Sequence, residues 1–168
     1  MKKMKLMNKI IVLLLFVAYL CGLLKIILFK FYWRDMTFLK DQLQKNLENP
    51  THLMSQLQSG NVIPFKTIFI NIHSLSGWHD FSNLVGNIVA FIPFGIFLVL
   101  LSKNNKLSFI GGLTLSLSLS LCLECLQVVF SLGIFDVDDL ILNTSGGVLG
   151  YGAIKLYGKE VEPNYKLN

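Results

Sequence analysis

Two segments with acidic and amide side chains lie beside long apolar runs in the second half of this 168-residue sequence. They are ECLQ at 124–127 and FDVDDLILN at 135–143. A charged side chain near the middle of a membrane-spanning helix costs about 2.5 to 3.5 kcal/mol, so such residues mark candidate functional sites. Carboxylates in this setting can hold a proton or a cation, or can act as a general base or metal ligand.

The apolar runs indicate that lipid is the solvent of this chain. Hydrophobic residues make up 53% of the sequence and the mean hydropathy is +0.58, which excludes an ordinary soluble domain. Lipid tolerates only helices or closed barrels as spanning structures. We therefore predict a single all-α domain over residues 1–168, an integral membrane bundle of about four transmembrane helices. The runs that have about the 17 to 25 residues needed to cross hydrocarbon are residues 10–29, 83–101, 107–130 and 140–157.

The distribution of basic residues predicts which loops face the cytoplasm. Lysines precede the first run, occur in the loop at 102–106 and follow the fourth run, whereas residues 131–139 contain three aspartates and no basic residue. By the positive-inside rule both termini are cytoplasmic (N-in/C-in), and the loops at 30–82 and 131–139 face outward. The opposing signal is a group of basic residues near the outer end of the first run, Lys25, Lys30 and Arg34.

The first run is about twice as long as the core of a signal peptide, and no small-residue cleavage site follows it. We expect it to remain as an anchor. The outward segment after it has Leu39, Leu43 and Leu47 at four-residue steps, which predicts a short amphipathic helix before the break at Asn49-Pro50. The next motif, NVIPFKTI at 61–68, is either a re-entrant or interfacial loop or a plain connector.

Each of the last three predicted helices carries a stripe of small and polar residues. In the 107–130 helix a stripe at four-residue steps leads to Glu124 and is extended by Gln127, and small residues there allow a close helix contact. The 140–157 helix repeats this design, and we expect Gly150 to let these two helices approach each other. The predicted packing residues are Gly112, Ser116, Ser120, Gly146, Gly147 and Gly150.

Under the predicted topology, all three stripes place their polar members at the outer end, so we expect one outward-opening pocket at outer-leaflet depth. Glu124, Asp136 and Asp139 are assigned mainly to a site, where their repulsion favours a bound proton or cation. Asp138 is expected to face solvent, and an aspartate at a helix start can instead cap it. For both Asn83 and Asn87, a role in helix packing and a role in the site are equally compatible with the sequence. The candidate pocket residues are Asn83, Asn87, Glu124, Gln127, Asp136, Asp138, Asp139 and Asn143.

The remaining composition indicates no cofactor. Cys21, Cys122 and Cys125 all lie within predicted spans, where we expect buried free thiols. CLEC at 122–125 has Cys-x-x-Cys spacing, but a metal site needs further ligands and no second such pair exists. The net charge of +5 suits the anionic inner leaflet, and no basic and aromatic patch points to nucleic acid.

Four ordered motifs in this sequence resemble the VanZ-like membrane proteins. They are NVIPFKTI at 61–68, NLVGNIVAFIPFG at 83–95, ECLQ at 124–127 and FDVDDLILNTSGGVLGYG at 135–152. The family takes its name from a protein that raises resistance to teicoplanin, a glycopeptide antibiotic with a fatty tail. The resemblance implies an antibiotic-resistance role at the outer surface of the cytoplasmic membrane of a Gram-positive bacterium. The partners it implies are membrane lipid and either a lipid-anchored glycopeptide or a lipid-linked cell-wall precursor.

Three classes of function are compatible with these features. The first is a non-enzymatic membrane protein that interferes with a lipid-tailed glycopeptide, or with its cell-wall precursor target, through the polar pocket. The second is a membrane enzyme acting on a lipid-linked cell-envelope substrate, with Glu124, Asp136 or Asp139 as general base or metal ligand. The sequence lacks a recognised metal motif, an elbow-type nucleophile or a histidine within the cluster. The third is a small transporter, for which no inverted repeat is visible.

Overall fold

The computed structural model is helical and describes residues 2–29, 36–73, 78–102 and 107–161. Within these ranges extended backbone pairs only at one isolated parallel bridge, between Asn61 and Asp136. The prediction of an all-α fold is confirmed. The helices are α1 Lys2–Phe29, α2 Met36–Glu48, α3 Pro50–Ser59, α4 Lys66–His73, α5 Trp78–Leu101, α6 Phe109–Val129 and α7 Val137–Val161.

Three of the four long helices are long and apolar enough to cross a membrane. The spanning segments are Asn8–Ile27 in α1, Asn83–Leu101 in α5 and Phe109–Val129 in α6. α7 has 25 residues but is not among them. Its first turn contains two aspartates, and its glycine, serine and asparagine residues lower its hydropathy. The structure therefore shows three candidate spans where the sequence predicts four.

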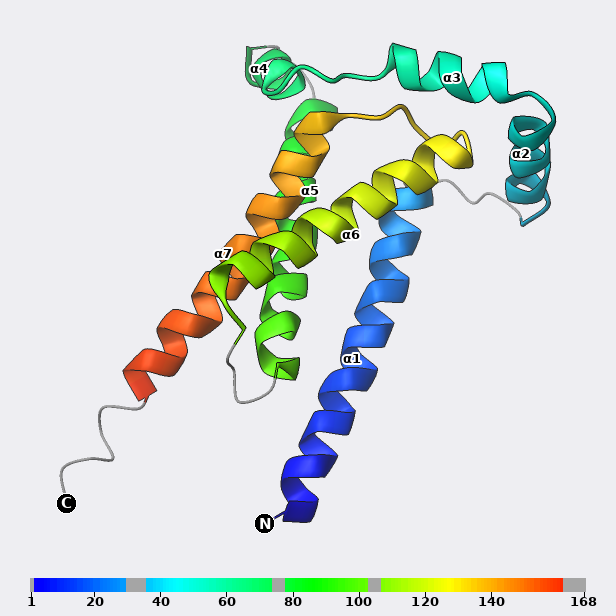
Figure 1. Cartoon of the computed structure of the whole chain (residues 1–168). Coiled ribbons are helices and arrows are strands. Elements are labelled where there is room, and N and C mark those ends of the chain that lie inside the picture. Colours follow the sequence, from blue (N-terminus) through cyan, green and yellow to red (C-terminus); the bar gives the residue numbers. More distant parts are fainter. Residues whose placement is uncertain (1, 30–35, 74–77, 103–106, 162–168) are drawn as a thin grey trace, which may run out of the picture.

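The long helices form a bundle with the three short helices at one end. In Figure 1, α2, α3 and α4 lie at the end where α1 and α6 finish and where α5 and α7 begin. The start of α1 and the end of α7 lie at the opposite end. The two ends therefore separate the segments that the lysine distribution assigns to opposite sides of a membrane.

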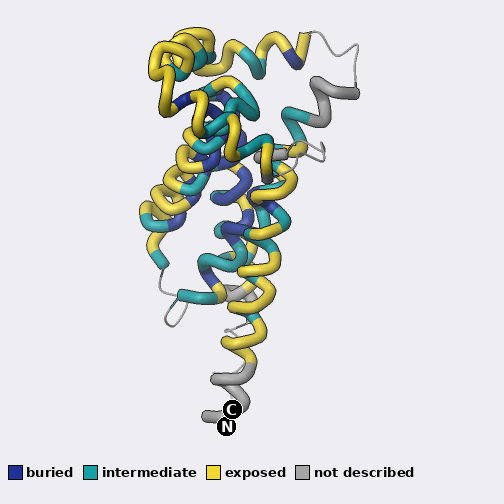
Figure 2. The backbone as a smooth tube through the Cα atoms, turned by 90° about the vertical axis from the view of Figure 1, so that its right-hand side faces the viewer, coloured by how far each residue is buried: buried dark blue, intermediate teal, exposed yellow. Residues whose placement is uncertain are grey.

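α1 packs against α5 and α6 through large apolar side chains. Leu23, Phe91, Phe94 and Leu123 form the buried core of this contact. Tyr19 donates a 2.7 Å hydrogen bond to the carbonyl oxygen of Ala90, in the turn of α5 that precedes Pro93. The backbone N–H that Pro93 lacks would bond the carbonyl oxygen of Val89, so the Tyr19 bond lies one residue from the carbonyl that the proline leaves without its helical partner. The other face of α1 is exposed, and Figure 2 shows buried residues concentrated in the bundle and exposed ones along α1.

α5 and α7 lie against each other because glycines face the backbone of the partner helix. A Cβ atom on Gly146 would lie 2.1 Å from the carbonyl oxygen of Ile88, and one on Gly150 would lie 1.9 Å from that of Ile92. Neither glycine has room for the methyl group of an alanine. The expectation that Gly150 faces the 107–130 helix is wrong, since its contact is with α5.

The neighbouring glycine of α7 faces α6 instead. A Cβ atom on Gly147 would lie 2.2 Å from the hydroxyl oxygen of Ser116, and Asn143 donates a 3.0 Å hydrogen bond to Ser120. LSLSLSL at 115–121 is thus part of a helix although its alternation is typical of a strand. The buried stripe of α6 consists of Gly112, Ser116, Ser120, Leu123, Glu124, Gln127 and Val128.

The three cysteines are free and exposed, so the expectation of buried thiols is wrong. On α6 the buried positions are taken by the stripe that faces the other helices, and Cys122 and Cys125 fall outside it. Exposed apolar side chains on a spanning helix contact lipid. The thiols of α6 therefore belong to its outer surface.

Residues 36–73 form three helices where the sequence predicts one. α2 ends before the Asn49-Pro50 break, as predicted, and Pro50 starts α3 at a position that needs no backbone N–H. Asn46 of α2 is buried and donates a 2.7 Å hydrogen bond to the carbonyl oxygen of Val129 at the end of α6. The Nδ1 atom of His52 lies 2.9 Å from the Asn46 side-chain oxygen. Asn46 thus fixes α2 and α3 to the end of the bundle.

Candidate functional site

Asp138 has a fully buried carboxylate in the first turn of α7. Its Oδ1 atom accepts a 2.5 Å hydrogen bond from the backbone N–H of Phe65, and Oδ2 accepts from those of Thr67 at 2.7 Å and Ile68 at 3.1 Å. These donors belong to the start of α4, where a helix has no internal acceptors and favours a negative charge. The expectation that Asp138 faces solvent is wrong, because this carboxylate caps α4.

Asp136 caps α7 itself and connects it to two other segments. Its Oδ1 atom accepts a 2.9 Å hydrogen bond from the backbone N–H of Asp138 and another of 2.9 Å from the side-chain amide of Asn61. The first of these bonds is the usual N-cap arrangement of an aspartate before a helix. The backbone N–H of Asp136 donates to a carboxylate oxygen of Glu124 at 3.0 Å. Through its backbone N–H and its carboxylate, Asp136 therefore joins α6, α7 and the segment before α4.

Asn61 is a central residue of this region, although the sequence does not predict it as a pocket residue. Its backbone N–H donates to Phe135 at 2.8 Å, and its carbonyl accepts from Val137 at 2.9 Å. Its side-chain amide also donates to the Thr67 hydroxyl at 3.1 Å. At Gly60, a Cβ atom would lie 2.7 Å from the Phe135 carbonyl oxygen. The sequence feature that could have identified Asn61 is its place in the NVIPFKTI motif, because a single amide in a polar segment shows no periodicity.

Glu124 and Gln127 share the buried stripe of α6 but reach different partners. Glu124 is 2% exposed and accepts from Asp136, whereas the amide of Gln127 donates a 2.8 Å hydrogen bond to the carbonyl oxygen of Ile27. Ile27 lies in the last turns of α1, where carbonyl groups lack helical partners. Gln127 therefore ties α1 to α6 and is directed away from the acids.

Asp139 and Asn143 occupy the face of α7 that meets α5 and α6. The side-chain amide of Asn87 donates a 2.6 Å hydrogen bond to Asp139, and Asn143 bonds Ser120. The side-chain oxygen of Asn143 is buried and accepts no hydrogen bond among the described residues. Asn83 lies one turn before Asn87 and is partly exposed. These residues link helices in pairs.

The hydrogen bonds of the candidate residues join several pairs of segments. Asn61, Glu124, Asp136 and Asp138 form one connected set, which we call the junction cluster. The Asn87–Asp139, Ser120–Asn143 and Ile27–Gln127 hydrogen bonds link further pairs of helices. Within the part of the chain that the structure describes, no group of three or more His, Cys, Asp or Glu side chains is placed to hold a metal ion. The junction cluster is arranged to bind backbone N–H groups.

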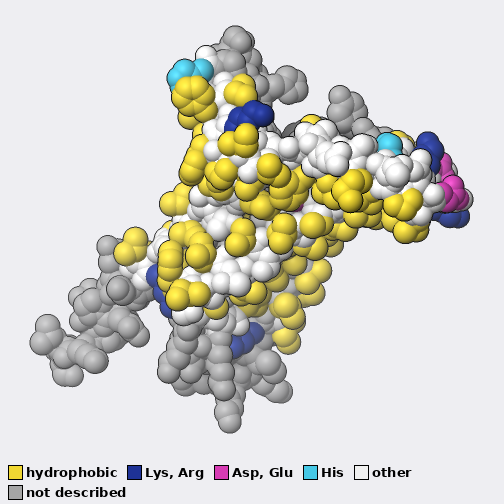
Figure 3. Space-filling model, turned by 45° about the horizontal axis from the view of Figure 1, so that its top comes forward, with side chains coloured by type: hydrophobic (Ala, Val, Ile, Leu, Met, Phe, Trp, Pro, Cys, Tyr) yellow, Lys and Arg dark blue, Asp and Glu magenta, His cyan; other side chains and the backbone are white. Residues whose placement is uncertain are grey.

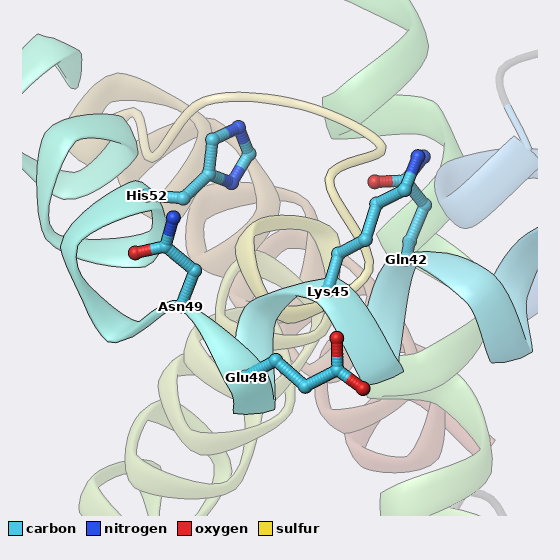
Figure 4. A pocket seen from close by; sticks show the side chains of 5 residues that line it. All are labelled: Gln42, Lys45, Glu48, Asn49 and His52. Atoms are coloured by element: carbon cyan, nitrogen blue, oxygen red, sulfur yellow. The ribbon is translucent and has the colours of Figure 1, made fainter.

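A surface depression of about 440 Å3 lies apart from these residues, on α2 and the start of α3. Figure 4 shows the five polar side chains that line it, and none of the eight candidate residues is among them. His52 at its edge is already paired with Asn46. The lining residues are Gln42, Lys45, Glu48, Asn49 and His52.

The fold and these contacts define a helical membrane protein with a buried polar junction at the end of its bundle. The chain belongs to the VanZ/LLP1 family, whose model matches residues 16–158. The resemblance carried by the four motifs is therefore confirmed. The chain is also 38% identical over 90 residues to Protein VanZ of Enterococcus faecium, a match that covers 53% of this chain and 52% of that protein. This chain thus aligns with about half the length of that relative. No solved structure matches the chain.

Proposed function

We propose that this protein is a multi-pass protein of the bacterial cytoplasmic membrane that lowers the susceptibility of a Gram-positive cell to lipid-tailed glycopeptide antibiotics of the teicoplanin type. Membership of the VanZ/LLP1 family and the similarity to Protein VanZ support the resistance role. In this proposal α7 is the fourth span, and α2, α3 and α4 face outward. The observation that supports the location is that the short helices are fixed to one end of the bundle, α4 by the junction cluster and α2 and α3 by Asn46.

The contacts of the acids favour a role without catalysis. Asp138 accepts three backbone N–H groups, and Asp136 accepts one backbone and one side-chain donor. A general base must instead be within reach of a proton on the substrate. The carboxylates therefore fix α4 and the segment before it at the outer end of the bundle, and we place the contact with the antibiotic or its lipid-linked cell-wall target at this segment, away from α2.

The orientation can be tested by thiol labelling in intact cells. In a variant that lacks the three native cysteines, Ser55→Cys on the exposed side of α3 is expected to react with a membrane-impermeant reagent. Ser102→Cys, at the opposite end of the bundle, is expected to react only after the cells are permeabilised. Reaction of Ser102→Cys from outside would contradict the proposed N-in/C-in topology.

The acids that are assigned to the site can be tested by changes that keep their size. Glu124→Gln and Asp139→Asn are each expected to abolish the increase in minimal inhibitory concentration that the wild-type protein gives against teicoplanin. An amide keeps the size of the acid but replaces a charged acceptor with a neutral one, so the hydrogen bonds from Asp136 and Asn87, which shape the outer part of the bundle, become weaker. The amount of protein in the membrane, measured by immunoblot, is expected to stay at the wild-type level.

The matched controls for this experiment are Glu48→Gln and Asp41→Asn. Both acids are exposed on α2, and the Glu48 carboxylate accepts a hydrogen bond from its helix neighbour Gln44. Full protection is expected in both controls. If Glu124→Gln and Asp139→Asn also retain full protection at matched membrane levels, their charges have no part in resistance.

A further inference from the structure

α4 and the turn before it have the reverse of the usual surface polarity. Asn71 in the middle of α4 is 8% exposed, whereas Phe69 is 62% and Ile72 is 49% exposed. Thr67, one turn before Asn71, also turns inward and accepts a hydrogen bond from Asn61. The turn before α4 exposes three more large apolar side chains, Val62, Ile63 and Phe65.

This polarity matches contact with hydrocarbon. A helix on a water-facing surface buries its apolar residues and exposes its polar ones, and contiguous exposed apolar patches mark a binding or membrane surface. In Figure 3 hydrophobic side chains lie on α4 and over the rest of the face in view, whereas most of the acidic side chains in view lie at the far end of α2 and α3. The spanning helices also expose large apolar side chains.

Four backbone N–H groups at the start of this segment have side-chain acceptors within the protein. In hydrocarbon there is no water for the unpaired N–H groups of a helix start, so the protein must supply their acceptors. Asp138 accepts those of Phe65, Thr67 and Ile68, and the Asn61 side chain accepts that of Ile63. A helix that starts in water needs no buried carboxylate for this purpose.

The length of α4 limits how far it can enter the bilayer. Eight residues of helix extend about 12 Å, which is less than half the thickness of the hydrocarbon core. Lys66 at its start and His73 at its end are both exposed and can reach the head groups. These features fit a segment that enters one leaflet and returns.

We infer that residues 62–72 are inserted among the acyl chains of one leaflet, and that lipid hydrocarbon is the partner of their exposed apolar surface. The choice of the outer leaflet rests on the orientation proposed above, whereas the insertion does not. An apolar surface at that depth lies where the fatty tail of a lipid-anchored molecule would be.

The inference can be tested by spin labelling the full-length protein in vesicles of phosphatidylcholine and phosphatidylglycerol. Labels at Phe69→Cys and Ile72→Cys, in the variant without native cysteines, are expected to be more accessible to oxygen than to a water-soluble nickel complex. Leu14→Cys, on the exposed face of α1, is the control for lipid, and Gln58→Cys, on the exposed side of α3, is the control for water. The label at Gln58→Cys is expected to show the opposite preference.

Two results would overturn the inference. Preference for the nickel complex at both α4 positions would place the segment in water. Low accessibility to both reagents would place it against protein, for example a second copy of this chain. If either cysteine variant fails to fold, Ile63→Cys provides the same measurement from the preceding turn. Because accessibility is measured without antibiotic, failure here is distinct from failure of the resistance experiment.

Discussion

Gly150→Ala is expected to prevent most of the protein from folding, whereas Gly152→Ala on the same helix is expected to be harmless. The added methyl group of Gly150→Ala would lie 1.9 Å from the carbonyl oxygen of Ile92, which is backbone and cannot rotate away. Overpacking costs typically 1 to 3 kcal/mol and occasionally more, and here two helices would have to separate. At Gly152 nothing lies within 4 Å, and alanine favours a helix over glycine by about 1 kcal/mol.

The measurement is the yield of monodisperse protein in detergent by fluorescence-detected size-exclusion chromatography, together with its melting temperature. Gly147→Ala provides an intermediate case, because its methyl group would meet the side chain of Ser116 rather than backbone. Equal yields for Gly150→Ala and Gly152→Ala would show that α5 and α7 are not in close backbone contact.

This contact illustrates what the sequence could and could not predict. Lipid permits few spanning structures, so the lengths of the apolar runs were enough to place α5 and α6 to within a few residues. A stripe of small residues indicates that a helix comes close but does not identify which helix. Gly146 and Gly147 are adjacent in sequence, yet the first faces α5 and the second faces α6.

The junction cluster was only partly predictable for a related reason. The cost of burying charge correctly drew attention to Glu124, Asp136 and Asp139 as residues with partners. The partners of Asp136 and Asp138 come from a segment about 70 residues earlier, whereas Glu124 accepts from Asp136 and Asp139 accepts from Asn87. Hydrogen bonds to backbone N–H groups leave no trace in residue type. The sequence therefore predicts a solvent-facing Asp138, whereas the side chain is fully buried.

Asp138→Asn is expected to release α4 from the bundle while leaving the long helices in place. The asparagine side chain has one acceptor oxygen and an NH2 group, so at least one of the three N–H groups from Phe65, Thr67 and Ile68 loses its acceptor. A buried donor without a partner costs about 1 to 3 kcal/mol, and the charge-assisted character of the remaining bonds is also lost. Phe65 has a φ of 68°, a left-handed conformation that is unfavourable for its side chain and is relieved when the turn opens.

Release of α4 costs less free energy than separation of the long helices, because α4 buries few side chains. The helices α5, α6 and α7 instead pack with glycines close to a neighbouring helix. Hydrogen exchange measured by mass spectrometry is therefore expected to rise by roughly 5- to 150-fold in peptides covering residues 62–72, which corresponds to about 1 to 3 kcal/mol. Exchange in α5 residues 88–99 is expected to be unchanged, as it should be everywhere in the Asp41→Asn control. Unchanged exchange at residues 62–72 in Asp138→Asn would mean that other contacts hold α4. A rise in exchange in α5 as well would mean that the Asp138 carboxylate supports the whole bundle.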